Sequence, residues 1–271
     1  MNTNPVSTLE SLPHALEFIR SAPLPSVPLT TDGGLESADE AFLDPAKDQS
    51  VAVGSGVMSF MKGLDPLRRR AIADSVLLAQ LVANQGVPDR ENVDAWYGAY
   101  FDVLGNLGWI IENKEFSVHE ASGRGVEAHE AILAVAAGLL GGGPALAVVK
   151  ATLGALEKIG SNNSWITLFN RDQQESKAAR FQISLAQQDD ADLCSLAMMA
   201  FALEASAKLI QVIFFKVRLT DARLRKLSTT ITIDPKMLAA VHPDIQARVA
   251  AFQKEYLRTL PELKVPASPN P

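Results

Sequence analysis

The sequence predicts an α+β protein: a helix-rich chain with a small antiparallel sheet formed mainly by its C-terminal half. Apolar residues recur from Val93 to Leu107 at the spacing of a buried helical stripe. From Arg180 to Gln188 apolar and polar residues alternate, as in a half-buried strand. The length of 271 residues and the hydrophobic share of 47% suit one sizeable core. We therefore expect three segments: an extended N-terminal arm over residues 1–50, a single α+β domain over 51–260 and a flexible tail over 261–271.

The composition of the first 50 residues explains the expected arm. Prolines and glycines are frequent between residues 20 and 50, which favours loop or extended chain, with at most a short helix near 36–43. Charged residues interrupt every apolar run of residues 1–20, so we expect no secretory signal. Synthesis is therefore expected in the cytoplasm, followed by membrane association or by export along a route that needs no signal.

Three helices are expected before residue 110. The glycines of segment 54–56 predict a turn, with a short helix following over 57–62. An aspartate and a proline at 65–66 then supply an N-cap and a first-turn proline, and this helix should stop near Gly86. The third helix should begin within 89–91 and carry the apolar stripe.

The segment 131–156 is the most apolar part of the chain. Gly141–Gly143 and Pro144 divide it into two pieces, and Lys150 interrupts the second piece. A buried helical hairpin is the plainer interpretation. A hairpin that inserts into a membrane, as in helical pore-forming toxins, stays open as an alternative, because each helix satisfies its own backbone in lipid. The wall of a lipid-binding cavity is a further alternative.

Four strands and a final helix are expected in the C-terminal half. The alternating segment is followed by apolar runs over 193–203 and 210–219, and then by a threonine-rich run over 227–233. The close spacing of these runs favours an antiparallel meander. A helix should follow from about 235 to 256, because an Asp-Pro pair opens it.

Cys194 is the only cysteine, so the chain can form no internal disulfide. It lies in an apolar run, where a small, inert core residue is the plainer interpretation. The functional alternative is an acyl acceptor whose thioester holds a fatty chain in the core, since each buried CH₂ contributes about 0.8 kcal/mol. A cysteine nucleophile completed by a histidine and an acid that are distant in sequence is another alternative.

No metal, nucleotide or nucleic acid is expected as a ligand. The histidines at 119 and 129 lack a metal-binding spacing, and no glycine run ends as a phosphate-binding loop does. The net charge of −6 argues against a nucleic-acid surface. Basic residues at the end of the third expected strand and beyond it could attract anionic lipid headgroups. These residues are Lys216, Arg218, Arg223 and Arg225.

The order of several segments resembles the Erwinia virulence factor family over about residues 50–260. The segments are DAWYGAYFDVLGNLGW (94–109), SWITLF (164–169), FQISLAQQ (181–188), LCSLAMMAFAL (193–203) and IQVIFFKV (210–217). This resemblance implies a compact α+β fold, a palmitate-like group on a buried cysteine through a thioester, and a role in persistence in an insect gut. Cys194 is the position that would carry the acyl group.

We therefore expect a bacterial virulence or host-colonisation factor that is acylated on Cys194, associates with membranes and is not an enzyme. An acyl donor would supply the chain. Acyl transfer through Cys194 and pore formation through residues 131–156 are the alternative functions. The expected lining of the acyl cavity is Trp96, Tyr97, Tyr100, Phe101, Trp109, Leu139, Leu140, Met198, Phe201 and Phe214.

Overall fold

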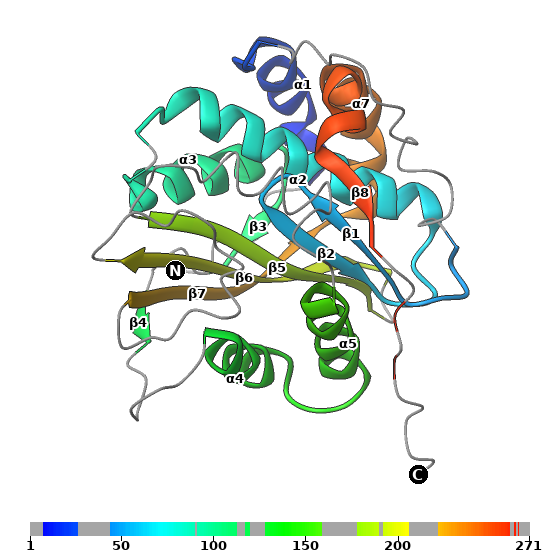
Figure 1. Cartoon of the computed structure of the whole chain (residues 1–271). Coiled ribbons are helices and arrows are strands. Elements are labelled where there is room, and N and C mark those ends of the chain that lie inside the picture. The colour runs from blue at the N-terminus through cyan, green and yellow to red at the C-terminus, as the bar shows by residue number, and fades with distance from the viewer. Residues whose placement is uncertain are drawn as a thin grey trace, which may run out of the picture.

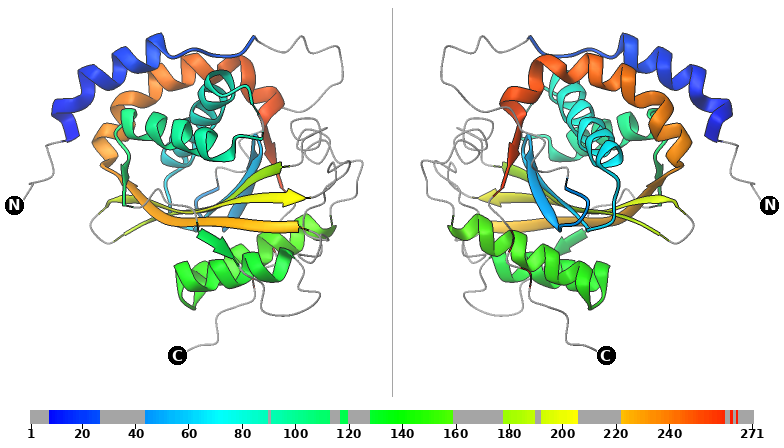
Figure 2. Two further views of the ribbon diagram at one scale, coloured as in Figure 1. Left: turned by 90° about the vertical axis from the view of Figure 1, so that its left-hand side faces the viewer. Right: turned by 90° about the vertical axis from the view of Figure 1, so that its right-hand side faces the viewer.

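Helices cover both faces of a central sheet in the computed structural model of the protein (Figures 1 and 2). On one face lie α1 (Leu12–Ser21), α2 (Pro66–Gly86), α3 (Val93–Asn106) and α7 (Pro235–Tyr256). On the other face lie α4 (Ala128–Leu140) and α5 (Pro144–Lys158). The predicted α+β class is confirmed. The structure describes residues 8–26, 44–89, 91–112, 117–119, 128–158, 178–189, 192–205, 222–260, 263 and 265.

In the described part of the chain the sheet has eight strands, in the order β3-β7-β6-β5-β2-β1-β8, with β4 also pairing with β7. Three of the four strands predicted for the antiparallel meander are present, as β5 (Ala178–Gln188), β6 (Cys194–Ala205) and β7 (Ala222–Ile233), and β6 pairs directly with β7. The strand expected over 210–219 lies outside the described residues. The sheet is mixed and larger than expected, because β5 also pairs in parallel with β2 (Gly56–Phe60).

The prediction of a helix over 57–62 was wrong, because residues 56–60 form the second strand of a hairpin. Gly54 has a positive φ of 54° and turns the chain from β1 (Gln49–Val53) into β2. Both strands are buried on both faces, so their apolar residues form a short continuous run instead of alternating. Three short strands that the sequence did not predict complete the sheet: β3 (Ile110–Ile111), β4 (Ser117–His119) and β8 (Leu257–Thr259).

The segment expected to be an extended arm contains helical structure. A 3₁₀ turn (Thr8–Ser11) leads into α1, whose Ala15 and Ile19 are buried. Arg20 of α1 donates a 2.8 Å hydrogen bond to Asp244 of α7. This part of the N-terminal segment is therefore packed against the helical layer.

The other helices agree with the sequence. Asp65 caps α2 by accepting hydrogen bonds from Leu67 and Arg68, and Asp234 caps α7 in the same way. The glycines before Pro144 separate α4 from α5, which pack on the sheet as the expected hairpin. These two helices have 13 and 15 residues, and none of the described helices is long and apolar enough to span a bilayer.

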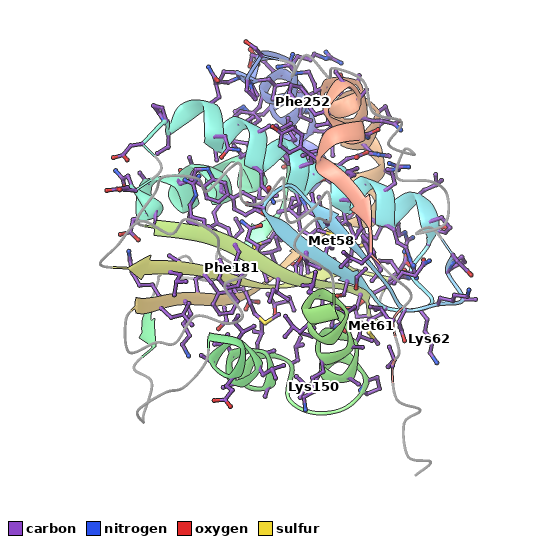
Figure 3. The ribbon with its side chains drawn as sticks, in the orientation of Figure 1. Met58, Met61, Lys62, Lys150, Phe181 and Phe252 are labelled. Carbon is purple, nitrogen blue, oxygen red and sulfur yellow. The ribbon has the colours of Figure 1, made fainter. Side chains whose placement is uncertain are left out.

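Two hydrophobic cores lie on the two faces of the sheet. The four-helix core lies between the sheet and α1, α2, α3 and α7, and it contains Met58 and Phe252. The two-helix core lies between the sheet and α4 and α5, and it contains Phe181 (Figure 3). Along β6 the residues alternate between these cores, so that Met198 faces one core and Phe201 the other.

Candidate functional site

Cys194 is the first residue of β6, and its side chain is fully buried. In the sheet it lies between Gln188 of β5 and Ile233 of β7. Its side chain belongs to the four-helix core, as do Leu196 and Met198 further along the strand. A group attached to the sulfur would therefore have apolar surroundings on the face that α2 and α7 cover.

A polar network ties the turn before Cys194 to the start of α2. Arg68 donates two hydrogen bonds of 2.7 and 2.9 Å to the carboxylate of Asp192. The side-chain amide of Gln188 also donates to this carboxylate. Asp192 has a φ of 69°, in the left-handed region that aspartate adopts more readily than most residues. The buried thiol therefore lies close to an exposed ion pair.

The surroundings of Cys194 keep its thiol protonated at neutral pH. Burial raises the pKa of the thiol, and the negative charges of Asp192, Asp189 and Asp234 raise it further. The positive charge of Arg68 acts in the opposite direction but does not reverse the shift. Because the thiolate is the reactive form, the resting thiol is a weak nucleophile.

Among the described residues, no histidine is hydrogen-bonded to Cys194. His14 bonds to Asn106 at 3.0 Å, and His242 bonds to Asp74 at 3.1 Å. His119 pairs with Leu224 at the opposite end of β7 from Ile233, and His129 belongs to α4 on the other face of the sheet. No cluster of histidine, cysteine and acidic side chains in the described residues could hold a metal ion.

The aromatic residues at the start of α3 lie on the same face of the sheet as Cys194, but toward the other end of β6, whereas Trp109 precedes β3, which pairs with β7 at the Cys194 end. Trp96 stacks on Tyr100 with 5.4 Å between ring centres and 9° between planes. The Tyr97 hydroxyl donates to the carbonyl oxygens of Phe181 and Phe201 at 3.0 and 3.2 Å. Phe201 follows Cys194 by seven positions on β6, which corresponds to roughly 23 Å along a strand. The ring of Tyr97 and the Cys194 thiol therefore stand well apart.

The sheet divides the predicted cavity residues into two groups. The four-helix core holds Trp96, Tyr97, Tyr100, Phe101, Trp109 and Met198, together with Cys194. The two-helix core holds Phe201, with Leu139 and Leu140 packed against it. Phe214 lies outside the described residues. Only the first group is on the side to which the Cys194 side chain belongs.

The predicted membrane-surface residues are described only in part. Arg225 is half-buried and donates two hydrogen bonds, of 2.6 and 3.1 Å, to Asp94 of α3. Its charge is therefore compensated within the molecule. Arg223 lies in β7, but its side chain is not described, and Lys216 and Arg218 lie outside the described residues.

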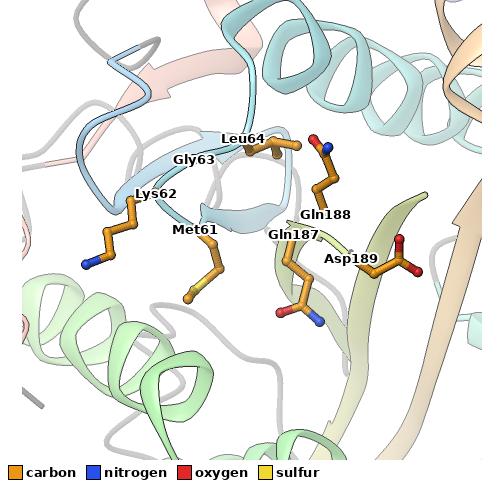
Figure 4. Close-up of a pocket in the computed structure, with 7 residues that line it drawn as sticks. All are labelled: Met61, Lys62, Gly63, Leu64, Gln187, Gln188 and Asp189. Carbon is orange, nitrogen blue, oxygen red and sulfur yellow. The ribbon is translucent and has the colours of Figure 1, made fainter. Parts of the chain in front are cut away.

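A surface pocket of about 300 Å³ lies where the parallel strands β2 and β5 end (Figure 4). Its lining is mixed, with Met61 and Leu64 just after β2 and with Gln187, Gln188 and Asp189 at the end of β5. Gln188 is also the β5 neighbour of Cys194. The pocket therefore lies one strand away from the thiol, and no sequence pattern predicted it.

A buried polar strip on β5 is a second feature that the sequence analysis missed. Arg180, Gln182 and Ser184 alternate with apolar residues, so we expected their side to face solvent, yet each is at most 5% exposed. The Arg180 guanidinium lies 4.5 Å above the Trp96 ring. Trp96 of the aromatic stripe of α3 therefore covers the Arg180 end of this strip.

No family model and no curated protein sequence matches the chain. Among solved structures, the chain is similar to the structure of the Evf virulence factor, with 12% sequence identity and a TM-score of 0.34 over 94% of this chain and 91% of that chain. It is also similar to a delta-endotoxin, with 12% identity and a TM-score of 0.34 over 79% of this chain and 90% of that chain. Both likenesses are weak, and neither assigns a family or a function to the chain.

Proposed function

We propose that the protein carries a palmitate-like acyl group as a thioester on Cys194 and acts as an acylated, membrane-associated factor in host colonisation. The observation that supports the acyl group best is the position of Cys194. This residue is the only cysteine of the chain, is fully buried in an apolar core and stands at the surface end of a strand. The colonisation role rests on the resemblance of the sequence segments.

Acylation at this position would be a transfer from a donor thioester. The sulfur of Cys194 would form a bond to the carbonyl carbon, the bond from that carbon to the donor sulfur would break, and the proton of Cys194 would pass to the donor thiol. Because burial raises the pKa of the Cys194 thiol, the donor must bring its carbonyl directly to the sulfur. The same burial would protect the finished thioester from hydrolysis.

We propose membrane association as a separate property, because an acyl chain held in the four-helix core is not available to a bilayer. Even an exposed single acyl chain gives only marginal binding, so another contact is needed. The α4–α5 hairpin is the candidate for that contact, because no charged residue lies between Glu130 and Lys150 and the glycines at its tip are exposed.

Intact-protein mass spectrometry tests the acyl group. We expect protein made in a bacterium that can acylate proteins to exceed the mass of the bare chain by one fatty acyl group, and hydroxylamine to remove the excess. Cys194→Ser should show the bare mass. A wild-type chain at the bare mass, from cells in which a known acylated control protein is modified, would contradict the proposal.

The two alternative functions give different results. If Cys194 transfers its acyl group, the extra mass should disappear when a cell extract that contains an acceptor is added. A stable modification should persist in the same extract. Pore formation by the hairpin would release dye from liposomes, and Gly142→Val should abolish that release. Loss of the extra mass in the extract, with no hydroxylamine added, would favour the acyl-transfer function.

A further inference from the structure

The pocket beyond the ends of β2 and β5 has one wall that is held rigidly in place. Met61 and Leu64 line this wall in the chain that follows β2. Arg69 of α2 is fully buried, and its guanidinium donates hydrogen bonds of 2.9 and 3.0 Å to the carbonyl oxygens of these two residues. The backbone N–H of Met61 donates to Ala186 of β5 at 3.0 Å. The wall is therefore preformed, as is usual for sites that bind small ligands.

The other wall is the end of β5, where two carboxamides face the pocket. Gln188 lies on the side of Leu64, and Gln187 lies on the side of Met61 (Figure 4). Each side of the pocket therefore combines a carboxamide with an apolar side chain. Because a carboxamide both donates and accepts hydrogen bonds, this lining suits a ligand that carries amide groups and methylene groups.

The two charged residues of the lining are directed elsewhere. The Lys62 side chain points away from the other lining residues (Figure 4). The Asp189 carboxylate accepts a 2.8 Å hydrogen bond from the backbone N–H of Leu193. The lining therefore favours an uncharged ligand over a phosphate or a carboxylate, which needs cationic or several N–H partners.

Gln188 also connects the pocket with Cys194. The two residues are directly opposite each other on the antiparallel strands β5 and β6, so their side chains extend from the same face of the sheet, and the strands are about 4.8 Å apart. The carboxamide of Gln188 donates to Asp192, which Arg68 holds with two further hydrogen bonds. Gln188 is exposed, so its side chain can turn to a ligand while Asp192 keeps its pairing with Arg68.

We propose that this pocket binds the pantetheine arm of an acyl donor and that Gln188 positions the arm beside Cys194. The inference rests on the proposed function, in which a donor thioester acylates this cysteine. A pantetheine arm is uncharged, carries amide groups along a chain of methylene groups and ends in the thiol that bears the acyl group. Its amides match Gln187 and Gln188, and its methylene groups match the apolar side chains of the pocket.

The arm would bring the donor carbonyl to a thiol that is buried in the resting protein. When Gln188 turns from Asp192 to an amide of the arm, the way from the pocket to Cys194 opens. The sulfur of Cys194 then forms a bond to the carbonyl carbon, the bond from that carbon to the sulfur of the arm breaks, and the proton of Cys194 passes to the thiol of the arm.

Binding of pantetheine to Cys194→Ser tests the pocket without any acyl transfer. We expect nuclear magnetic resonance titration to show binding, and Gln188→Met in the same background to raise the Kd about fivefold through the loss of one hydrogen bond. Gln246→Met makes the same change at an exposed position of α7 and should leave the Kd unchanged. No binding at millimolar pantetheine, or equal effects of the two substitutions, would overturn the inference.

Acylation with two kinds of donor tests the role of Gln188. Wild-type protein that hydroxylamine has stripped of acyl groups would receive palmitoyl pantetheine or the S-ethyl thioester of palmitate, which lacks the arm. Gln188→Met should raise the half-saturating concentration of palmitoyl pantetheine about fivefold and leave the reaction with the ethyl thioester unchanged. Equal effects on both donors would overturn the positioning role.

The natural source of the arm is identified by the same assay. Palmitoyl coenzyme A and palmitoyl carrier protein both present a pantetheine arm, and the donor with the lower half-saturating concentration is the source. The effect of Gln188→Met should persist with either donor, and its absence with both would count against the pocket.

Failure of the inference differs from failure of the proposed function. If Cys194 is acylated but Cys194→Ser does not bind pantetheine, the inference about the pocket is wrong and the proposed function stands. If pantetheine binds and Gln188→Met weakens it, but no donor acylates Cys194, the pocket is a pantetheine site and the proposed acyl group is wrong.

Discussion

Among single residues, Gly54 occupies a position where the buried side chain of Gln80 leaves no room for a Cβ atom. Gly54 has a positive φ of 54°, and a Cβ added to it would lie 2.1 Å from Oε1 of Gln80. That oxygen accepts a 3.1 Å hydrogen bond from the backbone of Ser55, and the Gln80 nitrogen donates a 3.0 Å bond to Val53. The amide of Gln80 therefore cannot move aside without losing two bonds in a buried place.

Gly54→Ala should destabilise the protein more than Gly63→Ala does. Gly63 also has a positive φ, of 92°, but a Cβ there would meet nothing within 4 Å. We expect a loss of about 1 kcal/mol in the free energy of unfolding for Gly63→Ala, from backbone strain alone. The loss for Gly54→Ala should be about 2–4 kcal/mol, because the hydrogen bonds of Gln80 are lost as well. Urea denaturation measures both losses, and equal values would contradict this account.

At the scale of elements, three hydroxyl groups join α5 to the first hairpin of the sheet. Thr152 of α5 lies 2.7 Å from the Ser50 oxygen and 2.9 Å from the Ser59 oxygen. The two serines are opposite each other on β1 and β2 and are 3.0 Å apart. Because all three side chains are buried, the bonds among them are not exposed to competition from bulk water.

Thr152→Val should lower the free energy of unfolding by about 1–2 kcal/mol, since it removes one of these three hydroxyl groups and keeps the side-chain shape. In a Ser59→Ala background the same substitution should cost less, because one of its hydrogen bonds is already gone. Thermal denaturation of the four proteins measures this difference. If the losses from Thr152→Val and Ser59→Ala simply add, the hydrogen bond between these two hydroxyl groups contributes nothing to stability.

The elements that the sequence predicted best are those with strong local signals. The starts of α2 and α7 follow from an aspartate cap and a following proline, and both are found where expected. The strand β2 could not be predicted, because Gly56–Phe60 acquires its partner β5 from a distant part of the chain. The burial of Cys194 was predictable from its apolar run, but the ion pair of Arg68 and Asp192 beside it depends on residues 124 positions apart.

At the scale of the whole molecule, a buried polar network connects α2 with α7. Asp74 of α2 is fully buried and accepts a 2.8 Å hydrogen bond from Gln253, and it also bonds to His242 at 3.1 Å. Gln253 and His242 both belong to the C-terminal helix. The network therefore joins an early helix to the last one.

Asp74→Ala should lower the free energy of unfolding by about 3 kcal/mol, because it leaves two half-buried polar groups of α7 without their partner in the core. Asp244→Ala is the matched control on the same helix, since it breaks the exposed pair with Arg20 of α1 and should cost less than about 1 kcal/mol. Denaturant titration distinguishes the two. Similar losses would mean that Asp74 has no special role in holding α7.

The parallel pairing of β2 with β5 also determines the order in which the protein can fold. The hairpin β1–β2 and the turn that joins β5 to β6 close locally, whereas Met58 must find Ser184 across the intervening helices. Closing so long a loop costs conformational entropy, and contacts between residues far apart in the sequence slow folding. The N-terminal hairpin leaves the ribosome well before β5 does, so one edge of β2 stays unpaired during this part of synthesis.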